Sequence, residues 1–316
     1  MKYVEFGTTG QKVSIVALGC MSLNPGRPEY GKPAVHRAFE LGITLFDTAD
    51  MYGKGKSEEI LGEALREGKI PREQVIIAPK CAAVQYDRTW TWNLSADHIK
   101  TSCEGSLKRL GMDYIDLYQP HRIDYLAHPE ETARALEDLK ADGKIQHVGV
   151  SNYIPDEIRA LSAYTRIETL QTLFSLLQQE PLETGLAAVC LEKKMNILCY
   201  SPLRGGFLTG SKLFTHTFDK SFGDWQEQRE HGVVAQLTAF ADKRGVTPGQ
   251  LALAWLMQLP GGVIPLVGSA NPAHVEEAVE AADIELARDE WYELTVIGRG
   301  RPMRWRQRPY AYLKDH

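Results

Sequence analysis

Hydrophobic and polar positions along the chain change their period many times. Short apolar runs of strand length alternate with longer stretches in which apolar residues recur at the spacing of one helix face. The runs expected to form strands are residues 15–18, 45–47, 75–80, 115–119, 146–151, 169–171, 196–200 and 263–266. Strands that alternate with helices in this way favour a parallel sheet.

Helical spacing is found between these runs, and the stretches include residues 56–66, 97–110, 130–141, 182–193, 247–258 and 272–282. Eight strands in such a series are enough to close a barrel, whereas an open doubly wound sheet more often has fewer strands and a glycine fingerprint after the first. The sequence therefore predicts an α/β fold, a (β/α)8 TIM barrel with extended βα loops. Residues 3–6 and 12–14, on either side of a turn, predict an N-terminal β-hairpin before the barrel.

The length of 316 residues admits either one large barrel or two ordinary domains. No Pro/Gly/Ser-rich linker or low-complexity block interrupts the alternation, and the longest irregular segment, residues 204–231, follows the seventh predicted strand. We therefore expect residues 1–316 to form a single domain.

Composition and charge narrow the class of partner. Apolar residues make up 43% of the chain, which is ample for a continuous core, and the formal net charge is -5. That charge provides no field that favours nucleic acid or an anionic membrane. A small molecule is therefore the expected partner, and both a monomer and a homo-oligomer are compatible with the sequence.

The first residues lack the apolar run of a signal peptide, and no stretch approaches the ~20 apolar residues that cross a bilayer. We therefore expect a cytoplasmic protein. The five cysteines are odd in number and have no C-x-x-C spacing, so neither a disulfide framework nor a zinc site is indicated. No bound metal is expected.

Familiar phosphate-binding motifs fail when each position is checked. Residues 55–57, Gly-Lys-Ser, resemble the end of a P-loop, but that motif needs glycine where Asp50 stands. Gly53 and Gly55 begin a dinucleotide fingerprint whose third glycine is replaced by Glu58. His-Glu-x-x-His and Gly-x-Ser-x-Gly are absent from the sequence, so metalloprotease and acyl-enzyme chemistry lose support.

Four polar residues fall where the second, third and fourth predicted strands end. Asp47, Lys80 and His121 stand at or just beyond those ends, and Tyr52 lies in the loop after Asp47. Active sites of (β/α)8 barrels lie at the carboxyl ends of the strands, so these side chains are expected at one mouth. Taken singly, each is more often an ordinary surface, capping or turn residue.

Together the four residues have a chemical logic. A tyrosine, whose ordinary pKa is about 10, is a poor proton donor or acceptor at neutral pH unless a neighbouring cation stabilises its phenolate. Lys80 supplies that cation, and Asp47 would hold Lys80 in place and charged. His121 would hydrogen-bond a carbonyl oxygen that becomes an alkoxide as hydride arrives.

Two neighbouring stretches carry a family resemblance. Residues 46–53, Phe-Asp-Thr-Ala-Asp-Met-Tyr-Gly, and residues 57–62, Ser-Glu-Glu-Ile-Leu-Gly, closely resemble the signature of the aldo-keto reductases. The resemblance covers nearly the whole chain and continues through residues 106–117, 143–145, 148–152 and 200–203. It implies a (β/α)8 barrel that transfers hydride with a nicotinamide cofactor.

The resemblance also implies a role for individual residues. The catalytic tetrad would be Asp47, Tyr52, Lys80 and His121, with the tyrosine as general acid and base. The nicotinamide carboxamide would be bound by Ser151, Asn152 and Gln171, and the nicotinamide ring would stack on Tyr200. The pyrophosphate would be covered by Ser201, Leu203, Gly206 and Leu208. Further cofactor contacts are expected from Gly19 and Met21.

The segment after the eighth predicted strand opens a helix and resembles the family's site for the adenosine 2′-phosphate. Its implied cofactor contacts are Gly268, Ser269, Ala270, Asn271, His274 and Glu277. A helix N-terminus favours an anion through its free N–H groups and its dipole. The family usually has lysine or arginine at one or both of the positions where Gly268 and His274 stand, so we expect a weak preference for NADP(H), with NAD(H) also possible.

Loops above the tetrad supply candidates for a substrate pocket. Trp90 and Trp92 follow the third predicted strand, and Met21, Asn24 and Tyr30 follow the first. Packing in the core or at the rim of the barrel explains each of them nearly as well.

The function expected from these residues is hydride transfer between NADP(H) and the carbonyl or alcohol of a small molecule, an aldehyde, ketone or keto sugar. An alternative is a regulatory subunit of the same fold that binds the cofactor with little turnover, although an intact tetrad has no chemical use there. A non-redox barrel in which Lys80 forms a Schiff base would leave the cofactor motifs unexplained. Substrate identity does not follow from fold or tetrad, because the pocket loops set it.

Overall fold

Parallel strands close into a barrel at the centre of the computed structural model, which describes residues 1–23, 28–86, 89–210, 224–269 and 271–300, with only the backbone at 28–30, 86 and 224–228. The strands of this sheet are β3 (Ala17–Gly19), β4 (Leu45–Asp47), β5 (Ile76–Ala78), β6 (Lys80–Cys81), β9 (Ile115–Pro120), β10 (Ile145–Ser151), β11 (Thr169–Leu173), β12 (Asn196–Tyr200) and β13 (Val263–Val267). Their order is β5-β4-β3-β13-β12-β11-β10-β9-β6. Because β5 and β6 are consecutive, both ends of this order lie in one stretch of chain, which confirms the predicted (β/α)8 barrel.

Pro79 divides the strand that the sequence predicted over residues 75–80. Proline has no N–H for a strand ladder, so β5 ends before it and β6 begins after it. The carbonyl of Pro79 still accepts a hydrogen bond of 3.2 Å from the Gln119 N–H on β9. On β5 the Ile77 N–H donates to Asp116 Oδ2 at 2.8 Å, and Arg72 Nη2 donates to the same oxygen at 2.5 Å. Side chains thus complete the barrel wall where the backbone ladder is interrupted.

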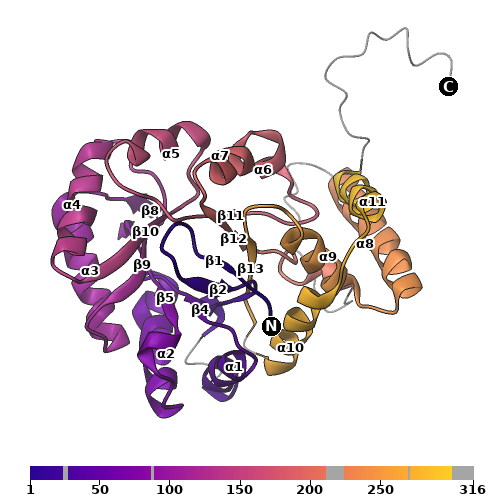
Figure 1. The fold of residues 1–316 in the computed structure, drawn as a ribbon, viewed down its shortest axis with the longest axis horizontal. Coiled ribbons are helices and arrows are strands. Elements are labelled where there is room, and N and C mark those ends of the chain that lie inside the picture. The colour runs from indigo at the N-terminus through magenta and orange to yellow at the C-terminus, as the bar shows by residue number, and fades with distance from the viewer. Residues whose placement is uncertain (24–27, 87–88, 211–223, 270, 301–316) are drawn as a thin grey trace, which may run out of the picture.

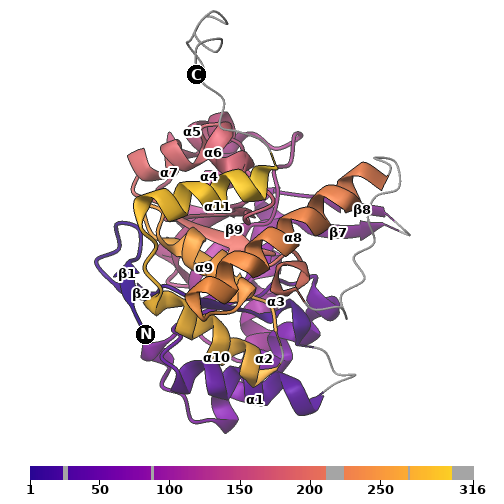
Figure 2. The same cartoon turned by 90° about the vertical axis from the view of Figure 1, so that its right-hand side faces the viewer.

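Helices alternate with the strands and surround the barrel (Figure 1). They are α1 (Pro28–Glu40), α2 (Lys56–Glu67), α3 (Ala96–Leu110), α4 (Pro129–Ala141), α5 (Pro155–Ser162), α6 (Glu180–Glu183), α7 (Leu186–Glu192), α8 (Asp224–Arg244), α9 (Pro248–Met257), α10 (Pro272–Glu280) and α11 (Arg288–Arg299). Figure 2 shows α8 and α11 side by side on one flank of the barrel.

Local chemistry sets the ends of several helices. The Ser95 hydroxyl caps α3 by accepting from the third N–H of the helix, and Gly111, with φ of 66°, ends it in the left-handed conformation.

Two predictions about these segments were wrong in detail. Residues 182–193, expected as one helix, are divided at Gly185 (φ 83°) into α6 and α7. Residues 204–231, expected to be irregular, include the first residues of α8.

The N-terminal hairpin closes one end of the barrel, as Figure 1 shows. Its strands β1 (Tyr3–Glu5) and β2 (Lys12–Ser14) pair antiparallel, as the sequence predicted. Phe6 and Val13 are fully buried and pack against barrel residues such as Leu117 and Leu198. Because the hairpin fills the end where the strands begin, only the carboxyl ends of the strands remain to form a mouth.

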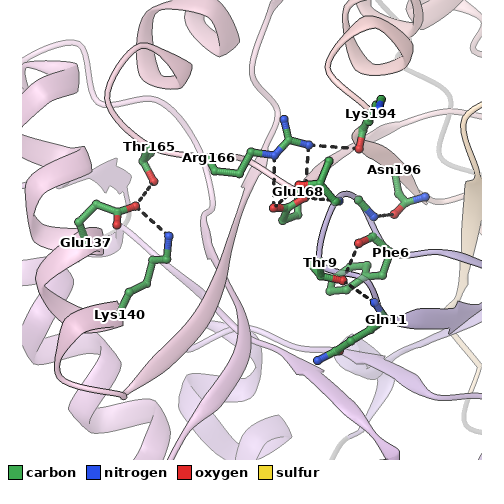
Figure 3. A network of polar contacts seen from close by, with 12 residues as sticks. Phe6, Thr9, Gln11, Glu137, Lys140, Thr165, Arg166, Glu168, Lys194 and Asn196 are labelled. Carbon is green, nitrogen blue, oxygen red and sulfur yellow. Dashed lines mark hydrogen bonds and ion pairs between the residues drawn. The ribbon is translucent and has the colours of Figure 1, made fainter.

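Polar contacts fix this hairpin to strands from the second half of the chain (Figure 3). The Thr8 N–H donates to the Glu168 carboxylate at 2.7 Å, and Arg166 donates to the same carboxylate. The Gly7 N–H donates to Asn196 Oδ1 at 2.8 Å. Gly7 has φ of 54°, and a Cβ there would collide with the Glu168 side chain, so this turn requires glycine.

No helix within the described residues has the length and apolar composition of a membrane span. All five cysteines are buried and unpaired. Within the same described ranges, no three or more His, Cys, Asp or Glu side chains are grouped so that they could hold a metal ion.

Asn196 offers a direct test of the hairpin anchor. Its side-chain amide, which is buried, donates to the carbonyls of Glu5, Gly261 and Gly262 and accepts from Gly7, so Asn196→Ala leaves several partly buried backbone groups without these partners. We expect the free energy of unfolding, measured by urea denaturation, to fall by about 2–3 kcal/mol. Lys12→Ala, at an exposed position on β2, should change it by less than about 0.5 kcal/mol. Equal effects of the two substitutions on the free energy of unfolding would contradict the role of Asn196 as an anchor of the hairpin.

Candidate active site

The four predicted tetrad residues meet at the open mouth of the barrel. Asp47 ends β4, Lys80 begins β6 and His121 follows the end of β9. Tyr52 begins the short 3-10 helix η2 (Tyr52–Gly55) between β4 and α2. Lys80 Nζ donates to Asp47 Oδ1 at 2.6 Å and to Tyr52 Oη at 3.3 Å. The rings of Tyr52 and His121 lie edge to face with centroids 5.9 Å apart.

The ammonium group of Lys80 is 0% exposed, and all three of its protons have partners. The third acceptor is the Thr48 carbonyl, 2.7 Å away. Burial by itself lowers the pKa of Lys80, but the opposite charge of Asp47 and the contacts with Asp47 and Tyr52 raise it above its ordinary value overall. Lys80 is therefore a fixed cation beside the Tyr52 hydroxyl.

Two amides complete the surroundings of Asp47. Its Oδ2 accepts from Gln171 Nε2 at 2.6 Å and from Gln119 Nε2 at 3.2 Å. The resemblance assigned Gln171 to the nicotinamide carboxamide, and in this structure its NH2 group is bound to Asp47. Gln119 was not expected at the site, although it is a buried polar residue of β9. A Cβ on Gly149 would come within 3.1 Å of the Gln119 side chain, so this glycine makes room for it.

A left-handed stretch of backbone presents Tyr52. Gly53, Lys54 and Gly55 have φ values of 56°, 55° and 87°, and together they turn the chain from the end of β4 into α2. Burial raises the pKa of Tyr52, and the nearby Lys80 charge acts in the opposite direction. The phenol is therefore protonated at neutral pH in the free protein.

His121 is neutral in this environment. Burial, followed by the positive charges of Lys80 and Arg122, lowers the pKa of His121 to about 2. Its Nδ1 is buried without a hydrogen-bond partner among the described residues. The ring lies 6.2 Å from that of Trp92, centroid to centroid. A neutral imidazole at this place can donate one hydrogen bond without adding charge.

The loop after β6 contains a hairpin, which consists of β7 (Ala83–Tyr86) and β8 (Thr89–Trp92). It brings Trp92 beside His121, where the guanidinium of Arg122 lies 5.5 Å from the centre of the Trp92 ring. Trp90, on the same strand, is 41% exposed. Asn24 and the side chain of Tyr30, the other predicted pocket residues, lie outside the described part of the structure, and the exposed Met21 is at the mouth in the 3-10 helix η1 (Cys20–Ser22).

The residues predicted around a nicotinamide lie next to His121. Asn152 follows β10 with φ of 61°, and its Nδ2 donates to the His121 carbonyl at 3.2 Å and to Ser151 Oγ at 2.9 Å. Its Oδ1 accepts from Tyr200 Oη, also at 2.9 Å. The structure thus brings Ser151, Asn152 and Tyr200 into one hydrogen-bonded group beside the tetrad.

The segments that follow β12 and β13 at the same mouth are characterised by their backbone conformation and by the space around their glycines. Ser201 and Gly206 have φ values of 51° and 92°, and the Gly206 and Leu208 N–H groups both bond to the Leu203 carbonyl. The side chain of Leu208 is buried in the core, which leaves only its backbone for a ligand. Around Gly268 a Cβ would meet nothing within 4 Å, whereas at Gly19 it would approach Gly268 Cα at 3.6 Å. These two segments offer open backbone surfaces.

The N-terminus of α10 contains the remaining predicted cofactor residues. Asn271 caps the helix by accepting from the Ala273 N–H at 3.1 Å, and Ser269 Oγ lies 2.9 Å from His274 Nδ1. The Glu277 carboxylate accepts from the Thr247 hydroxyl. Ala270 lies outside the described residues.

Comparison with known proteins decides the family. The model of the aldo/keto reductase family matches residues 16–299. The chain belongs to the aldo/keto reductase family. A 6-dehydroglucose reductase of Novosphingobium aromaticivorans is 34% identical over 309 residues, which cover 94% of this chain and 95% of the relative. Probable aldo-keto reductase 1 of Glycine max is 33% identical over 304 residues, 92% of this chain and 87% of the relative.

Solved structures of aldo-keto reductases have the same fold. The glycerol dehydrogenase AKR11B4 from Gluconobacter oxydans superposes with a TM-score of 0.85 at 27% identity, covering 96% of this chain and 97% of its own. A thermostable aldo-keto reductase in complex with the inhibitor epalrestat has a TM-score of 0.76 at 27% identity, covering 94% and 100%. The chain is therefore an oxidoreductase that uses a nicotinamide cofactor, and the predicted family is confirmed.

Replacing only one residue of the buried Lys80–Asp47 ion pair should destabilise this aldo-keto reductase. Lys80→Met leaves a buried carboxylate without its cation, and we expect the free energy of unfolding to fall by about 3–5 kcal/mol. The double variant with Asp47→Asn removes both charges and should recover much of that loss. Lys100→Met breaks the exposed Lys100–Asp138 pair and should cost less than about 1 kcal/mol. Denaturant titration of the four proteins decides the matter, and a double variant as unstable as Lys80→Met would contradict it.

Proposed function

We propose that this aldo-keto reductase reduces the carbonyl group of an aldehyde, a ketone or a keto sugar, or oxidises the matching alcohol, with Tyr52 as general acid and base. The observation that carries the proposal is the buried chain of contacts from Asp47 through Lys80 to the Tyr52 hydroxyl, beside the neutral imidazole of His121. The name of the Novosphingobium relative supports a sugar aldehyde within this range.

The Tyr52 hydroxyl moves the proton. In the direction of reduction it donates its proton to the carbonyl oxygen, and Lys80 Nζ, 3.3 Å away, stabilises the phenolate that remains. In the direction of oxidation the same pair accepts the proton from the alcohol. A fixed ammonium is needed because burial alone disfavours the phenolate.

His121 orients the substrate oxygen. With Nδ1 buried, Nε2 is the ring nitrogen that can reach a substrate, and it would donate a hydrogen bond to the carbonyl oxygen. Because the imidazole is neutral, it polarises the carbonyl without competing with Tyr52 for the role of acid. Asn152 holds the backbone of His121 in place through its 3.2 Å contact with the carbonyl.

The residues at the mouth fit a nicotinamide dinucleotide, which when bound supplies or accepts the hydride. The amides of Asn152 and Gln171 match a carboxamide, and the Tyr200 ring offers a face for stacking. The backbone of residues 201–208 and the open space at Gly268 would accommodate the phosphates. Because Gln171 Nε2 is bound to Asp47, its Oε1 would be the atom that accepts a hydrogen bond from the carboxamide NH2.

We further propose that NADP(H) is preferred over NAD(H), with weak discrimination. The N-terminus of α10 favours an anion, and Ser269 and His274, which lie 2.9 Å apart there, would bind a 2′-phosphate. A panel of aldehydes, ketones and sugars with each cofactor, followed at the nicotinamide absorbance, tests both the reaction and the cofactor. No turnover with any carbonyl compound or alcohol would overturn the proposal.

Tyr52→Phe should greatly reduce turnover and leave cofactor binding nearly unchanged. Loss of the phenol hydroxyl removes the proton donor, so we expect kcat to fall by roughly 100- to 10,000-fold while the dissociation constant of the dinucleotide stays within about twofold. Tyr164→Phe, at a half-exposed position remote from the mouth, is the matched control and should leave both values unchanged. A Tyr52→Phe enzyme with more than about a tenth of wild-type kcat would disprove the assignment.

His274→Arg tests the cofactor site. A guanidinium at this position should make a charge-assisted contact with the 2′-phosphate and tighten NADPH by about 1 kcal/mol or more, which is roughly fivefold in the dissociation constant. NADH, which lacks that phosphate, should gain little. His98→Arg adds the same charge on α3, on the other side of the barrel from α10 (Figure 1), and should not change either affinity. If the wild-type enzyme prefers NADH, the proposed preference for NADP(H) is refuted. If the two variants have equal effects, the proposed 2′-phosphate site at His274 is refuted.

A further inference from the structure

A partly buried ionic group lies beside the loop that presents Tyr52. It combines Asp50, two residues before Tyr52, with Glu58 on α2 and Arg109 on α3. Arg109 Nε donates to Glu58 Oε2 at 2.5 Å, and Arg109 Nη2 donates to Ser106 Oγ at 3.3 Å. Glu58 is 0% exposed, so its charge depends on this arginine.

Arg109 also touches the backbone of the loop. Gly55 has φ of 87°, and a Cβ there would lie 2.5 Å from Arg109 Cδ and 2.9 Å from its Nε. On the other side, a Cβ on Gly105 would lie 2.9 Å from Arg109 Nη1. Glycine on both sides lets the arginine lie between α3 and the left-handed turn that follows Tyr52. A side chain that contacts both Glu58 and Gly55 limits how far this turn can move.

The charges in this group do not balance when every residue is ionised. Arg109 offers one positive charge to the two carboxylates of Asp50 and Glu58, while Lys80 is already paired with Asp47. Asp50 Oδ1 and Glu58 Oε1 are both buried with no hydrogen-bond partner in the described structure. A buried carboxylate oxygen without a partner is costly, and a proton on the carboxyl group relieves that cost.

The surroundings of Asp50 favour its protonated form near neutrality. Burial, followed by the charge of Glu58, raises the pKa of Asp50 to about 7, against the opposing effects of Arg109, the Met51 N–H and Lys80. Burial also raises the pKa of Glu58, with Arg109 opposing it.

Cys81 on β6 and Tyr118 on β9 face Asp50 as well, and both are fully buried. Neither is a cation, so they give an ionised Asp50 no compensating charge.

We propose that Asp50, Glu58 and Arg109 position Tyr52 for proton transfer, and that the proton on Asp50 maintains this support. The inference rests on the proposed role of Tyr52. With Asp50 protonated, the positive charge of Arg109 balances the negative charge of Glu58, and the three residues that hold the turn have no net charge. When Asp50 ionises, a second negative charge faces Glu58 directly before Tyr52, and the turn loses its charge balance.

Variants of Arg109 test the positioning. A misplaced acid loses rate much more than affinity, so Arg109→Met should lower kcat by roughly 10- to 100-fold and leave the dissociation constant of NADPH, measured by fluorescence quenching, within about twofold. Arg109→Lys, which keeps the charge, should recover part of kcat. Arg66→Met is the matched control, because Arg66 also bridges α2 and α3, through the Leu110 carbonyl at 3.0 Å, without contacting the turn.

Arg66→Met should keep kcat within about twofold of wild type even if it lowers the melting temperature. A kcat for Arg109→Met as high as that of Arg66→Met would overturn the positioning role. If Arg109→Met does not fold, Glu58→Gln takes its place in the same comparison, because it weakens the same contact without removing the arginine.

Asp50→Asn tests the proton. Wild-type kcat/KM for carbonyl reduction should decline as pH rises through about 7, and Asp50→Asn should lose that decline. A second readout does not depend on activity. Because the pKa of Asp50 is higher in the folded than in the unfolded chain, wild-type stability falls as pH rises from the unfolded to the folded pKa. The melting temperature of Asp50→Asn relative to wild type should therefore rise from pH 4 to pH 7 and level off above it.

The outcomes separate this inference from the proposed function. A wild-type protein without carbonyl reduction, or an active Tyr52→Phe variant, would remove the proposed function. An Asp50→Asn enzyme that keeps the wild-type decline, or a relative stability that does not change with pH, would overturn the role of the Asp50 proton alone.

Discussion

The buried ammonium group of Lys80 constrains everything at the open end of the barrel. A positive charge without solvent is tolerated only when each of its protons has an acceptor, and here the acceptors come from the end of β4 and the turn after it. Asp47, whose second oxygen would otherwise be buried without partners, takes two amides from β9 and β11. The charge on one side chain thus fixes groups from four of the barrel strands.

Backbone strain gathers at the same end. Lys54, Asn152 and Ser201 are not glycines, yet each has a positive φ, and each follows a barrel strand that ends at the mouth. Such conformations cost free energy and persist where the surrounding structure holds them. The closed sheet provides that rigidity, since its strands are hydrogen-bonded in one continuous order whose two end strands, β5 and β6, are consecutive in the chain. A rigid wall with strained turns at its rim allows polar groups from distant parts of the sequence to be held at fixed separations.

Much of the fold could be predicted from the sequence because period and polarity are local signals. Apolar runs located the barrel strands, and the polar residues at or just beyond their ends are the four that meet at the mouth. Contacts between distant residues left no such signal. Gln119 looks like any residue of a buried strand until β11 brings Gln171 beside the same carboxylate, and Arg109 has the helical spacing of an ordinary surface arginine until Gly55 and Glu58 meet it. Pro79 and Gly185 are visible in the sequence, but whether they interrupt an element depends on tertiary packing.

The hairpin that closes the barrel has a consequence for the order in which the molecule can be completed during synthesis. The Thr8 N–H finds its acceptor 160 residues later in the chain, and the Gly7 N–H finds its acceptor 189 residues later. Contacts of such long range form late, because the intervening chain must first be made and brought together. A nascent chain leaving the ribosome therefore holds its first hairpin without the Glu168 and Asn196 contacts until the segments at β11 and β12 have emerged. The contacts that anchor the first residues to be made are therefore among the last native contacts to form.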